Sequence, residues 1–122
     1  MNTEKTTEDY LEAMLVLKEQ KGYIRSIDIA DYLCVKKPSV TYTTKRLKEK
    51  GLITMDADNL ITITEQGMVI AEETYKRHKA LTSFFISLGV DEQTAMNDAC
   101  KVEHDLSKQT FEALQRFIAN TK

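Results

Sequence analysis

The sequence predicts a mainly α-helical fold that contains one short β-hairpin. Four glycines and a single proline stand among 122 residues, so few positions interrupt a helix. Apolar residues recur at helical spacing over much of the chain, as in residues 8–20. Two apolar, β-prone runs at 52–55 and 60–63 flank the acidic turn residues 56–59 and are typical of a hairpin.

The first helix is expected over residues 8–20, where apolar positions share one face. Thr6 or Thr7 can cap its start. A short second helix is expected to follow a cap at Ser26.

A turn at residues 34–37 is predicted to separate the second helix from the third. Pro38 suits the first turn of a helix that extends to Lys50, and Gly51 ends it. The predicted elements therefore follow the order helix, helix, turn, helix and hairpin. This is the order of an N-terminal winged helix-turn-helix.

Three further helices are predicted after the hairpin, a long one over 65–88, one that ends near Leu106, and a last one. Each begins after a residue that can cap it: Thr64, Asp91 and Ser107. Gly89 fits the left-handed position that ends the long helix. We therefore expect one domain over 1–64 and a second, helical domain over 65–122.

Composition excludes several classes of protein. The 17 basic and 19 acidic residues give a formal charge of −2, which argues against a histone-like binder but allows a local basic patch. Two cysteines are too few for a disulfide scaffold. The polar residues 1–10 are unlike a secretory signal, and no apolar run is long enough to span a membrane. We expect a reduced, cytoplasmic protein.

Charge is distributed unevenly along the chain. Residues 34–50 hold six cations and a single acid, Glu49, for a local charge of +5. The rest of the chain must then carry −7, because the total is −2. This asymmetry favours a nucleic-acid contact at the third helix, although a solvated basic helix face has the same charge pattern.

The third helix has two distinct faces. At 100° per residue, Val40, Thr44 and Leu47 share one face that must pack inward. Hydroxyls, a phenol and cations lie around the rest of the helix, as a major groove and its phosphates require. The predicted DNA-binding residues are Lys36, Lys37, Pro38, Ser39, Thr41, Tyr42, Lys45 and Arg46. Asp56 and Asp58 at the hairpin tip predict at most a weak contact there.

Residues able to bind a metal recur at helical spacing. Cys100, Glu103 and His104 are predicted to lie within one helix and to share a face, where a thiolate, a carboxylate and an imidazole can converge. Asp9 and Glu12 have the i, i+3 spacing in the first helix. Each pattern alone is also compatible with surface acids and a packed cysteine.

The motifs taken together resemble one family. In order they are Thr7-Glu8-Asp9-Tyr10-Leu11-Glu12, Asp28-Ile29-Ala30, Pro38-Ser39-Val40-Thr41, Thr64-x-x-Gly67, Arg77-His78 and Cys100-x-x-Glu103-His104. They resemble the iron- and manganese-dependent repressors of the DtxR/MntR type, over about residues 5–118, in a short form that lacks the SH3-like domain.

The resemblance implies that the winged helix binds a roughly palindromic double-stranded DNA operator. The second domain would be a helical dimerisation and metal-binding domain, which encloses Mn(II) or Fe(II), one or two ions per protomer, together with the first helix. The protein would act as a homodimer that represses metal-uptake genes. The implied ligands are Asp9, Glu12, His78, Glu103 and His104.

Cys100 makes this ligand set a mixture of two types. The resemblance places a glutamate at this position in manganese-type members and a cysteine in iron-type members. Asp9 is of the manganese type, because iron-type members have a methionine there. Thr82 and Met96 also leave the iron-type ancillary site incomplete. A thiolate is softer than a carboxylate, so the residues leave the choice between Mn(II) and Fe(II) open.

The residues also leave two other classes of function to weigh. A metal hydrolase would need a phosphate loop or a nucleophile motif, and the sequence has neither G-x-S-x-G nor a glycine-rich loop, so we expect no enzyme. A winged-helix regulator that does not sense metal is the main alternative. Cys34, in the turn before the third helix, is expected to be a packed core residue.

Overall fold

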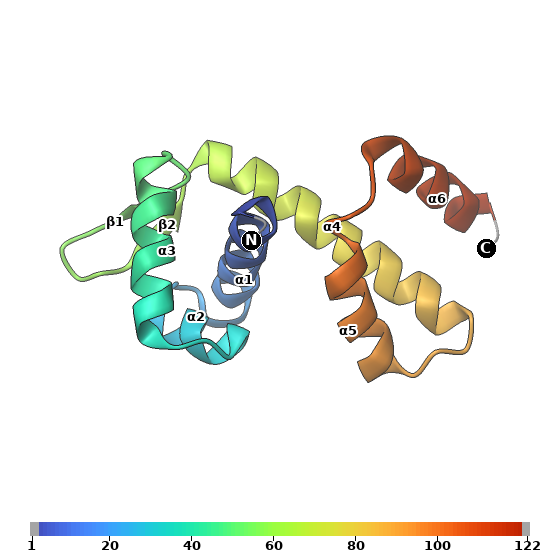
Figure 1. Cartoon of the computed structure of the whole chain (residues 1–122), viewed down its shortest axis with the longest axis horizontal. Coiled ribbons are helices and arrows are strands. Elements are labelled where there is room, and N and C mark those ends of the chain that lie inside the picture. Colours follow the sequence, from blue (N-terminus) through green and yellow to red (C-terminus); the bar gives the residue numbers. More distant parts are fainter. Residues whose placement is uncertain (1–2, 121–122) are drawn as a thin grey trace. The chain divides into compact units, whose positions relative to one another are not determined.

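The computed structural model describes residues 3–120 and is mainly helical, as predicted (Figure 1). The elements are α1 (Thr3–Lys21), α2 (Ser26–Leu33), α3 (Lys37–Glu49), β1 (Ile53–Met55), β2 (Ile61–Ile63), α4 (Glu65–Ser87), α5 (Glu92–Val102) and α6 (Lys108–Asn120). The helix-turn-helix, the hairpin and the helical second part are therefore confirmed. None of the helices within residues 3–120 is long and apolar enough to cross a membrane.

The chain forms two compact units. The first extends to Glu73 and the second begins at Thr74, within α4. The prediction of a domain boundary after residue 64 concerns function and stays a prediction.

Helix α1 begins earlier than the sequence suggested. Thr6 and Thr7, expected as caps, lie within the helix, which already includes Thr3. Glu4 stands in its first turn, where an acidic side chain interacts favourably with the helix dipole, so the polar residues before the apolar stripe continue the helix. Every residue from Tyr10 to Leu17 is buried.

The core of the first unit joins its three helices to the hairpin. Fully buried side chains come from the three helices and from β1: Leu11 and Met14 of α1, Ile29 of α2, Val40 and Leu47 of α3, and Ile53 of β1. Helix α1 contacts α2 and β2, and α2 contacts α3. Lys21 at the end of α1 donates to Asp28 of α2 at 2.9 Å. This hydrogen bond raises the pKa of Lys21.

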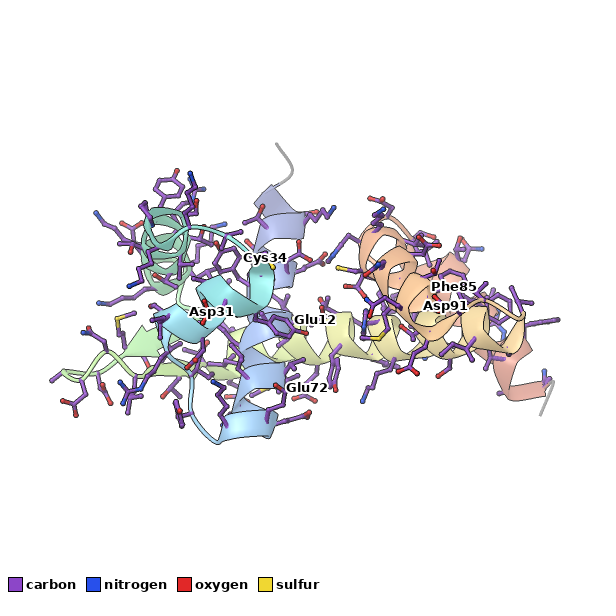
Figure 2. The ribbon with its side chains drawn as sticks, turned by 90° about the horizontal axis from the view of Figure 1, so that it is seen from below. Glu12, Asp31, Cys34, Glu72, Phe85 and Asp91 are labelled. Carbon is purple, nitrogen blue, oxygen red and sulfur yellow. The ribbon has the colours of Figure 1, made fainter. Side chains whose placement is uncertain are left out.

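The turn between α2 and α3 corrects two expectations. Arg25, rather than Ser26, is the N-cap of α2, because its extended backbone directs its carbonyl to the amides of Asp28 and Ile29. Cys34 is exposed and not packed in the core. It has a φ of 56° and occupies the left-handed position that ends α2, where the chain turns at the surface (Figure 2). Pro38 lies in the first turn of α3 as predicted.

The hairpin pairs β1 with β2 in antiparallel register, Ile53 with Ile63 and Met55 with Ile61. Its tip is fixed by Asp56, whose carboxylate accepts from the amides of Asp58 at 2.9 Å and Leu60 at 3.0 Å. The acidic tip is therefore partly a requirement of the turn itself.

A close approach joins the start of α4 to the segment between α3 and the hairpin. The hydroxyl of Thr64 accepts from the amide of Gly67 at 3.2 Å and donates to the carbonyl of Gly51 at 2.7 Å. A Cβ atom on Gly67 would overlap the carbonyl of Leu52 and lie 2.9 Å from Cγ2 of Ile63. The Thr64-x-x-Gly67 motif is thus explained by backbone packing.

The second unit packs α4, α5 and α6 around a small apolar core. Its buried residues are Leu81, Ala95, Ala99 and Phe111. Asp91 and Ser107 cap α5 and α6 as predicted, through the amides of Thr94 and Thr110. The hydrogen bond from the amide of Thr94 lowers the pKa of Asp91.

We predict that Gly67→Ala lowers the free energy of unfolding by about 2 kcal/mol, because the added methyl group meets backbone that cannot move freely. In an unobstructed helix the same change is favourable by about 1 kcal/mol. Urea denaturation measures the difference. Glu72→Ala, at an exposed position of α4 (Figure 2), is the control and should change stability by less than about 0.5 kcal/mol. An increase in stability for Gly67→Ala would contradict the close approach.

Candidate metal centre and nucleic-acid interface

Three of the predicted ligands come together within the second unit. Glu103 accepts a hydrogen bond at Oε2 from Nδ1 of His78, on α4, over 3.1 Å. Oε1 of Glu103 lies 3.4 Å from Nε2 of His104. The side chain of Glu103 is fully buried and that of His104 is 1% exposed. We call these three residues the His78–Glu103–His104 cluster.

Helix α5 ends before this cluster, which corrects a prediction. Glu103 and His104 were expected inside a helix that extends to about Leu106, but α5 ends at Val102 and Glu103 is its C-cap. The amide of Asp105 bonds to the carbonyl of Val102 at 2.9 Å, which tightens the last turn. The two ligands therefore lie at the helix end and in the following loop.

Arg77 holds the segment that follows this early end. Its Nη1 donates to the carbonyl of Glu103 at 3.0 Å and to the carbonyl of Leu106 at 2.7 Å. Its guanidinium also lies 5.1 Å from the ring centroid of Phe111. Arg77 thus satisfies two carbonyls that the regular hydrogen bonding of α5 leaves without a helical partner. The sequence marked Arg77 only as part of the Arg77-His78 motif and did not indicate this role.

The cluster has an unsatisfied acceptor that fits a bound cation. Oε1 of Glu103 is buried, and within residues 3–120 no donor forms a hydrogen bond with it. A buried carboxylate oxygen without a donor is costly. Two imidazoles beside a carboxylate form a donor set that suits first-row divalent metals. The residues present therefore fit the metal that the sequence implies.

The other predicted ligands are carried by α5 and α1. Cys100 is on α5, one turn before Glu103, and its side chain is exposed. Asp9 and Glu12 are one turn apart on α1 in the first unit. Glu12 is buried and Asp9 is partly exposed. Their part in metal binding stays a prediction.

Helix α3 presents the two faces that its sequence indicates. Val40, Thr44 and Leu47 are buried, and the hydroxyl of Thr44 donates to the carbonyl of Val40 at 2.8 Å. All eight predicted DNA-binding side chains are exposed, namely Lys36, Lys37, Pro38, Ser39, Thr41, Tyr42, Lys45 and Arg46. The contact of each with DNA stays a prediction.

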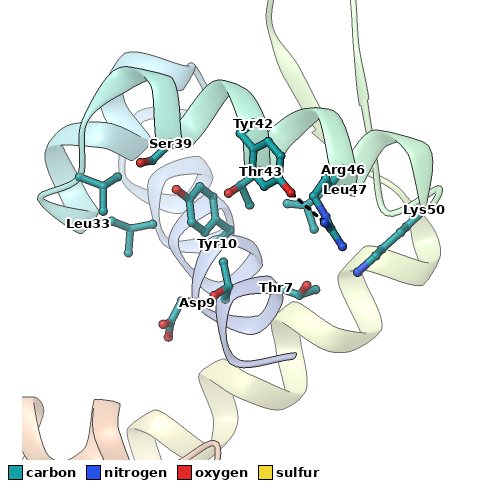
Figure 3. Close-up of a pocket in the computed structure, with 12 residues that line it drawn as sticks. Thr7, Asp9, Tyr10, Leu33, Ser39, Tyr42, Thr43, Arg46, Leu47 and Lys50 are labelled. Atoms are coloured by element: carbon teal, nitrogen blue, oxygen red, sulfur yellow. Dashed lines mark hydrogen bonds between the residues drawn. The ribbon is translucent and has the colours of Figure 1, made fainter. Parts of the chain in front are cut away.

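Tyr42 and Arg46 are ordered against each other on α3. Nη1 of Arg46 donates to the hydroxyl of Tyr42 at 2.9 Å, and the guanidinium lies 5.6 Å from the ring centroid (Figure 3). This pairing limits the side-chain freedom of Arg46, so less entropy is lost when it binds an acceptor.

Comparison with known proteins assigns both parts of the chain. Residues 2–59 match the N-terminal DNA-binding domain of iron-dependent repressors, and residues 64–122 match their metal-binding and dimerisation domain. An HTH-type transcriptional regulator of Methanocaldococcus jannaschii is 37% identical over 117 residues, which are 94% of each chain. The transcriptional regulator MntR of Escherichia coli O157:H7 is 34% identical over 110 residues, or 90% of this chain and 71% of that protein.

A solved structure shows the same fold. The manganese regulator SloR matches with a TM-score of 0.82 at 26% identity, over 93% of this chain. The match covers 53% of the SloR chain, so this chain spans about half its length. The protein belongs to the DtxR/MntR family of iron-dependent repressors, as its motifs indicated. The family consists of transcriptional regulators and not of enzymes.

We predict that Arg77→Met weakens both the fold and the metal site, because two loop carbonyls lose a charged donor. The loss of stability should be about 2 kcal/mol. Urea denaturation and Co(II) titration followed by absorption measure the two effects. Arg77→Lys should recover part of the Co(II) spectrum, and Lys76→Met, an exposed cation on the same helix, serves as the control. Unchanged Co(II) binding in Arg77→Met would show that the loop does not depend on Arg77.

Proposed function

We propose that this protein is a divalent-metal-dependent DNA-binding regulator that responds to Mn(II) or Fe(II) and represses genes of metal uptake. The observation that carries the proposal is the buried His78–Glu103–His104 cluster with its unsatisfied carboxylate oxygen. The same chain contains α3, a helix whose exposed side chains include Lys45 and Arg46. Family membership supports both halves of the proposal.

The proposed ligands are those of the cluster together with Asp9, Glu12 and Cys100. Four of these six side chains carry a negative charge when they are ionised, and like charges repel. A bound divalent cation supplies the positive charge that offsets this repulsion. Asp9 and Glu12 are fixed on α1, α1 packs against α2, and α2 packs against α3. A constraint on α1 therefore reaches the DNA-binding helix through direct packing.

The preferred metal depends on Cys100. Carboxylates suit Mn(II), whereas a thiolate shifts preference toward Fe(II) and later metals in the affinity series. The exposed position of Cys100 on α5 leaves its thiol accessible to an ion. We propose a site that binds Fe(II) better than an all-carboxylate set would.

We also propose that the protein acts as a homodimer on a roughly palindromic operator. The matched dimerisation domain supports this assembly. Large apolar side chains of the second unit are exposed, namely Ile86, Leu88, Met96 and Phe117. Leu81 and Phe111, by contrast, are already buried. Two symmetric recognition helices would read two related half-sites.

We predict that metal raises the affinity for operator DNA by about 5- to 150-fold, the usual range for coupled sites. The test is anaerobic capture of genomic DNA fragments by the purified protein with Mn(II), with Fe(II) or with a chelator. A few specific fragments should be recovered with metal alone.

Glu103→Gln should abolish this response, because it removes the charge of the buried carboxylate. Glu112→Gln changes an exposed acid of α6 and is the matched control. Equal recovery with chelator would instead identify a winged-helix regulator that does not sense metal. Recovery under no condition would remove the DNA-binding proposal.

We predict that Cys100→Glu shifts relative affinity toward Mn(II) over Fe(II) by about tenfold, because a carboxylate replaces the softer thiolate. Competitive titration under anaerobic conditions measures the ratio. Cys34→Ser removes the other exposed thiol and should leave the ratio of Mn(II) to Fe(II) affinity unchanged. An unchanged ratio in Cys100→Glu would exclude Cys100 as a determinant of selectivity.

A further inference from the structure

A groove lies within the first unit between α1 and α3 (Figure 3). Its volume is about 420 Å³, within the size range of small-molecule sites. One wall is formed by residues of α1, including Thr7 and Tyr10, and the other by residues of α3, from Ser39 to Leu47. Of the proposed metal ligands, only Asp9 lines this groove.

The floor of the groove is apolar and rigid. Tyr10 is 5% exposed and Leu47 is 1% exposed, so both side chains are held by the core of the unit. Leu33 and Val35, from the turn between α2 and α3, extend the apolar lining. An apolar body of ligand size would bury surface here without rearranging the fold.

Cations are concentrated on the α3 side of the groove. Arg46 and Lys50 line it, beside the hydroxyls of Tyr42 and Thr43. Among residues 3–120, Arg46 and Lys50 form no ion pair with an acid. Asp9 is the one acid in the lining, and its carboxylate points away from α3 in Figure 3. Two cations that form no ion pair within residues 3–120, beside an apolar lining, favour an anion with an apolar body, although Glu4 and Glu8 line a neighbouring cavity with Lys50.

We infer that this groove binds a small organic carboxylate with an aromatic or branched apolar body. The carboxylate bonds to Arg46 and Lys50, and the body lies in the groove between α1 and α3. A free inorganic anion would make no use of the apolar lining, and a neutral aromatic molecule would form no charged hydrogen bond with either cation.

Occupancy of the groove has a consequence for DNA binding, and this part rests on the proposed function. Ser39, Tyr42 and Arg46 line the groove and are also predicted DNA-binding residues. A carboxylate bonded to Arg46 occupies the donors that a phosphate or a guanine would use. The ligand would therefore compete with operator DNA for Arg46.

The first experiment measures binding without DNA. The ¹⁵N-labelled full chain is titrated with 1-naphthoate, and 1-naphthalenemethanol serves as the neutral probe. We expect saturable shifts confined to the first half of α1 and to α3, and at least about tenfold weaker binding of the neutral probe. Shifts centred on exposed Leu88 and Phe117 would show only non-specific binding to an apolar surface and would overturn the inference.

Charge variants locate the carboxylate. Lys50→Met should weaken binding of 1-naphthoate by about tenfold, because it removes one charged hydrogen bond. Lys45→Met is the matched control, since Lys45 is an exposed cation of α3 that does not line the groove. Both positions are exposed, so neither change should unfold the protein. Equal weakening by both variants would indicate diffuse charge attraction and would contradict a site at Lys50.

The second experiment adds a captured operator fragment. In the wild-type protein 1-naphthoate should lower DNA affinity, and in Lys50→Met it should do so only at about tenfold higher concentration. Saturable binding of 1-naphthoate without any effect on DNA affinity would support the binding site in the groove and would contradict competition with DNA. If no DNA fragment is captured at all, the proposed function fails, but the first experiment still tests whether the groove binds an organic carboxylate.

Discussion

The guanidinium of Arg77 holds the segment that follows α5, and the geometry of the candidate metal centre depends on that segment. An α-helix that continued to Leu106 would keep Cys100, Glu103 and His104 on one regular face. The chain instead leaves the helix after Val102, and Arg77 binds the carbonyls of Glu103 and Leu106 beyond that end. The carboxylate of Glu103 then lies between two imidazoles. The cation–π contact with Phe111 joins the same guanidinium to the core of the second unit.

Local sequence signals predicted most of the fold. The hairpin follows from two β-prone runs around an Asp56 turn, and Thr64, Asp91 and Ser107 cap helices as expected. These features depend on residues a few positions apart, so a short stretch of the sequence is enough to predict each of them. The faces of α3 were predictable for the same reason, because burial follows helical periodicity.

The expectations that failed depend on contacts between distant residues or on backbone conformation. The segment after α5 is held by Arg77, which lies 26 residues before Glu103. The exposure of Cys34 follows from a left-handed backbone, which its residue type does not indicate. The membership of His78 in the cluster came from resemblance, since no periodicity joins α4 to the end of α5. Pairing of Glu103 with both imidazoles required the structure.

The self-contained turn at Asp56 separates the hairpin tip from the rest of the molecule. Its carboxylate holds the amides of Asp58 and Leu60, while the hairpin base is held through Thr64 and Gly67. The tip residues can therefore be exchanged or extended without disturbing α1, α2 or α3. A lineage that carries this framework can alter a few tip residues, and with them the charge and length of the hairpin, while the helices and the His78–Glu103–His104 cluster stay the same.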